Sequence, residues 1–148
     1  MPKENRRVAM VASLALMLAA ACNGATPPTA LDAVAVQPGG PIAPGAGMTA
    51  NFVRTGYAVT GTATLSIRND TAQLDFSADF NIAQTPGPFV YLNTTGNANQ
   101  GTPLRVGALR SRTGAQRYTF LVPPGVRYTR VLIWCDPFNV GMAEATLP

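Results

Sequence analysis

A strict alternation of apolar and polar residues over residues 71–80 constrains the fold of this chain more than any other feature. Every even position is apolar, from Ala72 to Phe80, and every odd position carries Thr, Gln, Asp or Ser. Successive side chains of a β-strand point to opposite faces, whereas a helix repeats about every 3.6 residues. The period of two therefore predicts a strand with one face in a core and the other in water.

The preceding run, residues 62–67, alternates in the same way, and the tripeptide Arg68-Asn69-Asp70 between the two runs has the composition of a hairpin turn. We expect these two strands to pair directly. Residues 31–36 could add an edge strand, and further short strands are predicted at residues 89–92, 104–109, 116–122, 128–135 and 140–145. The predicted fold class is all-β, an antiparallel β-sandwich of about seven to eight strands.

The first 22 residues predict export rather than a membrane span. Basic residues come first, fourteen apolar or small residues follow from Val8 to Ala21, and Cys22 comes next. That stretch is shorter than the roughly 18 to 20 residues that a spanning helix needs. The segment from Leu18 to Cys22 resembles the lipobox of bacterial lipoproteins, although its leucine stands one position early. By that resemblance residues 1–21 are a signal peptide, and Cys22 is lipidated.

The lipobox resemblance implies a protein exported to the bacterial cell envelope and held on a membrane by its lipid. Asn23 replaces the aspartate that retains many lipoproteins in the inner membrane, so the outer membrane is favoured if the host has two. Residues 22–47 are rich in Pro, Gly and Ala, which predicts that the lipidated cysteine is followed by a flexible tether. Such a tether would hold residues 48–148, the single folded domain, on the order of 25 to 40 Å from the membrane.

The composition removes most enzyme classes. Histidine is absent, which excludes Ser-His-Asp and Cys-His catalysis and histidine-ligated metals, and the only lysine, Lys3, lies in the signal peptide. The residues indicate no metal site, leave any cofactor unknown, and show no acid, base or nucleophile set of an enzyme beyond one cysteine. Removal of the signal peptide lowers the net charge from +4 to +2, and no aromatic residues interleave the remaining arginines, so no nucleic-acid partner is expected.

Cys135 is the one thiol left once Cys22 is assigned to the lipid. Exported proteins usually carry cysteines in disulfide pairs, so an unpaired cysteine needs an explanation. Three remain open: a buried inert thiol, an intermolecular disulfide or a redox-active group. The run from Tyr128 to Cys135 becomes apolar on both faces toward its end, which predicts a strand covered on both sides. This burial favours a thiol that fills core volume.

Five segments carry a family resemblance: residues 61–65, 87–92, 107–109, 114–118 and 131–140, with Ala143, Ala145 and Leu147 at the end. Through these segments, residues 57–147 resemble the DM-thirteen domain, a family of small all-β extracytoplasmic modules. The similarity is most specific in residues 131–140, and one departure is Phe89, which stands where the family has an aspartate after Gly-Pro. The resemblance implies an electron-transfer or redox role with Cys135 as the working group.

Two hypotheses of different classes follow. In the first, Cys135 undergoes reversible thiol oxidation or anchors a redox group and passes electrons to a partner protein at the envelope. Trp134 and Phe138 would then form the apolar shell that controls access to the thiol. In the second, the chain is a non-catalytic binding or structural lipoprotein that holds a protein or glycan partner through loops such as residues 93–101.

Overall fold

The computed structural model describes residues 28–35 and 47–148. The predicted signal peptide, the predicted lipidation site at Cys22 and most of the predicted tether lie outside the described residues. Within the described ranges, no helix is long and apolar enough to cross a membrane.

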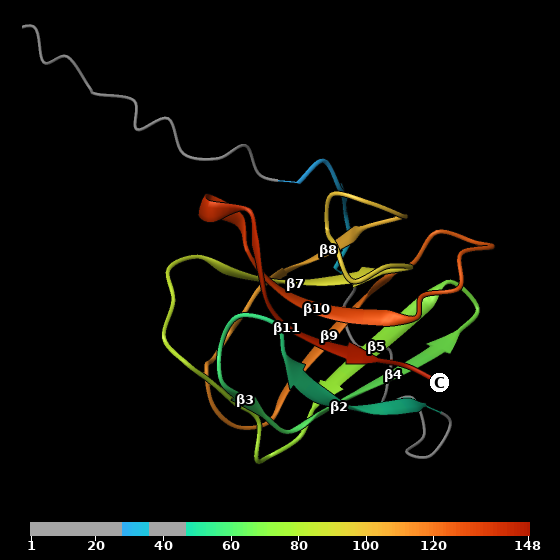
Figure 1. Ribbon diagram of the computed structural model, residues 1–148. Helices are drawn as coiled ribbons and strands as arrows, with labels where there is room; N and C mark the ends of the chain where they lie inside the picture. Colours follow the sequence, from blue (N-terminus) through green and yellow to red (C-terminus); the bar gives the residue numbers. More distant parts are fainter. Residues whose placement is uncertain (1–27, 36–46) are drawn as a thin grey trace, which may run out of the picture.

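The regular secondary structure of the described residues is almost entirely β (Figure 1). The strands in chain order are β1 (Leu31–Asp32), β2 (Met48–Arg54), β3 (Val59–Thr60), β4 (Thr62–Arg68), β5 (Thr71–Phe76), β6 (Asn81–Ile82), β7 (Pro88–Asn93), β8 (Leu104–Ala108), β9 (Gln116–Leu121), β10 (Arg130–Cys135) and β11 (Val140–Thr146). One short 3-10 helix, η1 (Asp136–Phe138), joins β10 to β11. Eight of the strands have at least five residues. The all-β prediction is confirmed.

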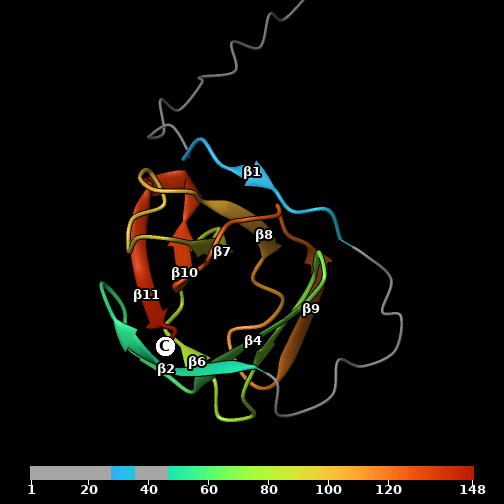
Figure 2. The same ribbon diagram turned by 90° about the vertical axis from the view of Figure 1, so that its right-hand side faces the viewer.

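β2 belongs to both halves of a nine-stranded sheet and makes that sheet fold back on itself. The strand order is β1-β8-β7-β10-β11-β2-β4-β5-β9, while β3 and β6 form a separate small sheet. Residues 48–51 of β2 pair with β4, and residues 52–54 pair with β11. Figure 2 shows the two halves curled around a common interior. The arrangement is sandwich-like, as predicted, with one strand shared between its halves.

Residues 28–35, called the N-terminal strap below, lie across the gap between β8 and β9. β1 pairs in parallel with β8. On the other side, the Leu121 amide of β9 donates to the Val34 carbonyl at 2.8 Å, and Ala35 bridges Phe120. The sequence predicted a flexible tether here, with an edge strand as the alternative. The strap binds because its backbone groups complete two strands that would otherwise present unpaired edges.

The β4–β5 hairpin forms as predicted. Arg68 pairs with Thr71 across the turn. Asn69, between them, has a φ of 52°, a left-handed conformation that asparagine tolerates better than most residues. The turn residues therefore set the register in which the two alternating runs face each other.

β5 ends at Phe76, before the sequence alternation does. The Ser77 amide donates to the Thr62 carbonyl at 3.1 Å, and the Ser77 hydroxyl accepts from the Thr62 amide at 2.8 Å. The Phe80 amide then donates to the Ser77 carbonyl at 3.1 Å, which turns the chain. Phe80 still reaches the core, where its ring centroid lies 4.7 Å from that of Phe76. Beyond Phe76 the alternation thus ends in one buried residue, Phe80, outside a strand, whereas Ala78 is exposed.

β10 is buried on both faces, as its sequence predicted. Its odd-numbered residues, including Cys135, belong to the main core between the two halves of the sheet. The even-numbered residues Leu132 and Trp134 point the other way and form a second cluster with Tyr91 of β7 and Ala98. Two covers are therefore needed, one for each face of the strand.

The loop of residues 93–101 covers part of the second cluster and is organised by the Asn93 side chain, which is completely buried. The amide nitrogen of Asn93 donates to backbone carbonyls of the loop, and its oxygen accepts from backbone amides. The partners are the carbonyls of Asn97 and Gln100, at 2.8 and 2.9 Å, and the amides of Thr94 and Thr102, at 2.8 and 3.0 Å. One side chain thus replaces the backbone pairing that the loop lacks.

We predict that Asn93→Asp lowers the free energy of unfolding by about 2 to 4 kcal/mol, because a buried carboxylate would face two carbonyl oxygens and lose their donor. Urea unfolding followed by circular dichroism measures the change. Asn99→Asp is the matched control: Asn99 is exposed, and we expect a loss below about 1 kcal/mol. Equal losses in the two variants would contradict the role assigned to Asn93.

Candidate functional site

Cys135 is the last residue of β10, and its thiol is buried in the main core with 1% of the residue exposed. It is a free cysteine within the described part of the chain. The Cys135 Sγ donates to the Pro86 carbonyl at 2.9 Å. The thiol is therefore held by one hydrogen bond to a segment that precedes β7.

Residues 86–88 fit closely against the end of β10 and the start of η1. Cys135 pairs with Pro88, and the Asp136 amide donates to the Gly87 carbonyl at 3.3 Å. Gly87 has a φ of 60°, and a β-carbon added there would lie 2.7 Å from the Pro137 ring. Only glycine combines this backbone conformation with so close an approach. The thiol, 1% exposed, therefore becomes accessible only when the chain around it moves.

The structure does not gather Trp134 and Phe138 around the thiol. Trp134 is next to Cys135 on a strand, so their side chains point to opposite faces. The Trp134 indole nitrogen donates to the Asn139 side-chain oxygen at 3.1 Å, in the second cluster. Phe138, in η1, is 60% exposed. The shell expected from the sequence is therefore spread over three environments.

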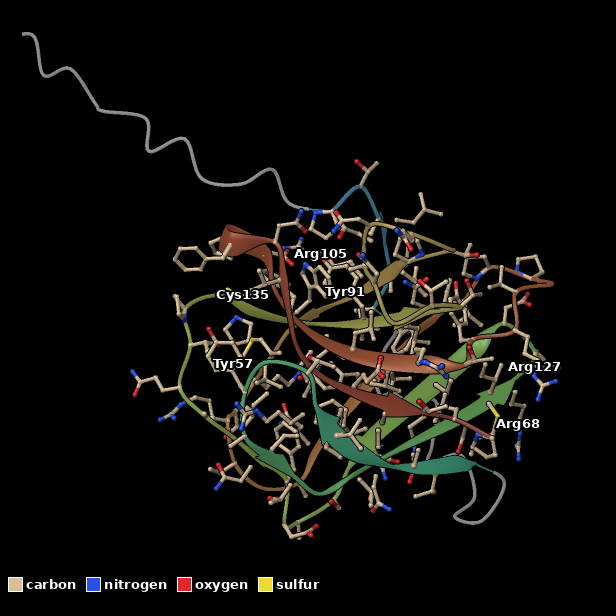
Figure 3. The ribbon with its side chains drawn as sticks, viewed as in Figure 1. Tyr57, Arg68, Tyr91, Arg105, Arg127 and Cys135 are labelled. Carbon is tan, nitrogen blue, oxygen red and sulfur yellow. The ribbon has the colours of Figure 1, made fainter. Side chains whose placement is uncertain are left out.

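A polar network that the sequence did not indicate lies on the Trp134 side of the sheet. Asp136 accepts a hydrogen bond from the Tyr91 hydroxyl at 2.8 Å on one carboxylate oxygen, and its other oxygen pairs with Arg105 Nη2 at 2.9 Å. Arg105 Nη1 also reaches Asp32 of the strap at 3.4 Å. The Arg105 guanidinium lies 3.6 Å from the centre of the Phe89 ring, a cation–π contact. Figure 3 shows Tyr91 and Arg105 side by side at this end of the molecule.

Burial and the carboxylate of Asp136 fix the charges in this network. Burial, followed by the hydrogen bond to Asp136, raises the pKa of Tyr91 well above its usual value, so the phenol stays neutral. Burial is the largest single influence on the pKa of Arg105 and lowers it, but the interactions with Asp136, Tyr91 and Asp32 together outweigh burial and raise that pKa. The network thus holds a neutral phenol and a charged guanidinium on one carboxylate.

Strand register, and not a local motif, creates this network. Tyr91 of β7 lies opposite Arg105 of β8 and opposite Leu132 of β10, and Asp136 follows the end of β10. The Tyr91 side chain lies on the same side of the sheet as Trp134. A pattern of alternation shows that residues share a face, but it does not show which residue of the next strand lies opposite.

A pocket of about 350 Å³ opens above the network, between the strap and η1. Its polar floor consists of Arg105 and two carboxylates, those of Asp32 and Asp136. Apolar walls come from the strap and from the first turn of η1, at Pro28, Ala30 and Pro137. Among residues 28–35 and 47–148, no group of three or more His, Cys, Asp or Glu side chains could hold a metal ion.

The chain was compared with known protein families, curated proteins and solved structures. The family model described as electron transfer DM13 matches residues 51–147, which is well over half of the chain. The match runs from β2 to just beyond β11, so it covers both halves of the curled sheet and the thiol. No curated protein and no solved structure matches the chain significantly.

We predict that, above about pH 10, the free energy of unfolding falls less with rising pH in Tyr91→Phe than in the unmodified protein. The pKa of Tyr91 is raised in the folded state, so its stabilising effect is complete below the usual phenol pKa of about 10 and is lost as the pH rises further. The free energy of unfolding of the unmodified protein should therefore fall more steeply above about pH 10 than that of Tyr91→Phe.

Urea unfolding at several pH values measures both slopes, and at neutral pH the variant should be less stable by about 1.5 to 3 kcal/mol. Burial also raises the pKa values of Tyr118 and Tyr128, which remain in both proteins and give the common background slope. Parallel curves above about pH 10 would contradict the assigned role of Tyr91.

Proposed function

The chain belongs to the electron transfer DM13 family, and on that premise we propose that it is an electron-transfer module in which the Cys135 thiol is the redox group. A lipid on Cys22 would hold it on the membrane of a bacterial cell envelope. The observation that carries the proposal is the match of the electron transfer DM13 family model to residues 51–147, a range that contains Cys135, a free cysteine. The thiol is 1% exposed and donates to the Pro86 carbonyl, in the segment that precedes β7. Movement of one short segment would give a partner access to it.

Thiol–disulfide exchange is the chemistry that a lone cysteine supports. The Cys135 thiolate attacks one sulfur of a partner's disulfide, a new disulfide joins the two proteins, and the partner's second sulfur leaves as a thiolate. A dithiol donor then attacks the Cys135 sulfur and releases the partner in its reduced, dithiol form. The donor's second thiol next attacks the donor–Cys135 disulfide and frees Cys135. Two electrons pass from the donor dithiol to the partner disulfide, and Cys135 is regenerated.

Residues 86–88 cover the thiol, and this cover would make the exchange selective for a partner that displaces it. An exposed thiolate in an oxidising compartment would proceed along the oxidation ladder to irreversible products. The Pro86 hydrogen bond and the fit of Gly87 against Pro137 keep Cys135 away from small oxidants until the segment opens. A partner that binds beside η1 could stabilise the open form.

We predict that Cys135 reacts with a thiol reagent through local opening. If the local opening costs about 2 to 5 kcal/mol of free energy, Cys135 in the folded protein should react with the reagent roughly 30- to 5,000-fold more slowly than in the unfolded chain. The rate in dilute urea should be nearly independent of urea, because little surface is exposed. Mass spectrometry should also detect a mixed disulfide with glutathione that a dithiol reverses. A rate that follows global unfolding at all urea concentrations would refute the redox proposal.

Two glycines provide a matched test of the closing segment. Gly87→Ala combines a positive φ with a clash against Pro137, which should destabilise the closed segment. We expect the thiol reagent to label Cys135 roughly tenfold faster in this variant. Gly125 has a φ of 78° but nothing within 4 Å of an added β-carbon, so Gly125→Ala brings similar backbone strain far from the clash. The labelling rate of Gly125→Ala should stay within about twofold of the unmodified rate. Equal acceleration by both substitutions would show that the effect is global.

The lipid anchor has a separate test. In a bacterial host that lipidates exported proteins, the unmodified chain should sediment with membranes, and Cys22→Ser should not. Mass spectrometry of the amino-terminal peptide identifies the lipid directly. Membrane association that survives Cys22→Ser would contradict the assignment of Cys22 as the anchor.

A non-catalytic binding module is the second candidate, and the burial of Cys135 within the main core favours it. In that case the thiol fills core volume, and the pocket beside the strap receives the partner. Cys135→Ala would then cost stability without changing partner binding, whereas Arg105→Ala would weaken binding. The labelling experiment separates the candidates, since a core thiol reacts only on global unfolding.

A further inference from the structure

An apolar groove of about 300 Å³ lies between the N-terminal strap and the end of β9. Its exposed apolar side chains are Leu31 and Val34 of the strap, 66% and 62% exposed, and Leu121 of β9, 39% exposed. Single exposed apolar residues are common, but three that line one groove form a patch that favours contact with another apolar surface. The remaining lining residues are Asp32, Leu104, Val122 and Pro123.

The attachment of the strap limits how far this groove can be from Cys22. The strap is fixed to the domain from its first residue, since Pro28 is buried and lines the pocket beside η1. Pro28 follows Cys22 by six residues. Six extended residues span at most about 20 Å. This is less than the distance that a tether reaching to residue 47 would allow.

We propose that the groove formed by Leu31, Val34 and Leu121 rests on the bilayer that holds the lipid of Cys22, an inference that rests on the lipid anchor of the proposed function. The short connection keeps the groove at a high effective concentration next to the membrane, so a contact too weak to bind alone becomes populated. Apolar side chains at such a surface enter the boundary between headgroups and acyl chains. The domain then has one preferred orientation.

The charges around the groove indicate which feature of the lipid it contacts. Asp32 is the one charged residue among those that line the groove, and it pairs with Arg105 at 3.4 Å. No lining residue is basic, so the groove offers nothing to bind an anionic headgroup. Burial of apolar surface therefore drives the contact, and neutral phospholipid suffices.

A matched pair of valines tests the orientation. Val34 lies in the groove, while Val53 of β2 is 50% exposed, and Figure 2 shows β1 and β2 on opposite sides of the curled sheet. Val34→Cys and Val53→Cys, each with Cys135→Ser in the full lipidated chain, are labelled with a fluorophore. The proteins are placed in phosphatidylcholine vesicles that contain nitroxide-labelled lipid. Because interfacial side chains lie about 5 to 10 Å deep, quenching at position 34 should exceed that at position 53 at least threefold.

The outcomes separate this inference from the proposed function. Quenching at position 34 that falls when Leu31→Asp and Leu121→Asp are added supports the groove contact. Equal quenching at both positions, in protein that sediments with the vesicles, overturns the contact but leaves the anchor and the redox proposal intact. If quenching is equal and the protein is also a dimer, the groove is assigned to contact with a second copy of the chain. Failure to sediment with vesicles overturns the anchor and this inference together, while thiol labelling still tests Cys135.

Discussion

The burial of β10 on both faces is the constraint on which the rest of the structure depends. One face contributes Cys135 to the main core, and the other contributes Trp134 to a second cluster. The curled sheet covers the first face, because β2 turns the strands β4, β5 and β9 back over it. The strap and the loop organised by Asn93 contribute to the cover of the second face.

These two covers separate the chemistry of Cys135 from that of Asp136, although the residues are adjacent in sequence. The thiol lies toward the main core and meets the Pro86 carbonyl, whereas the carboxylate joins Tyr91 and Arg105 near the pocket. Residues 86–88 contact both sides, since the Gly87 carbonyl accepts from the Asp136 amide. Pro137 of η1 lines the pocket and also lies against Gly87 of that segment.

Much of the fold could be predicted from local pattern, and much of the site could not. Alternation and turn chemistry predicted the β4–β5 hairpin, because both depend on residues near in sequence. The end of β5 could not be read, since Ser77 turns the chain through bonds to Thr62, fifteen residues away. The strap lies in a segment predicted as a tether from its Pro, Gly and Ala content, with a possible edge strand at residues 31–36, and long-range pairing with β8 and β9 decided that it joins the sheet. The partners of Asp136 likewise come from other strands, whose register no local motif encodes.

By itself, the sequence determined the all-β class, the strands that alternate, the two-sided burial of β10 and the family through its closing run. These properties follow from side-chain periodicity and residue type, which are local. The tertiary structure alone decided that the strap closes the sheet, that the thiol lies beneath Pro86, and that Tyr91, Asp136 and Arg105 form one network. Each of these joins residues far apart in the chain, and their meeting depends on strand order and register. Pairing energy between distant strands, which no single segment contains, selects that order.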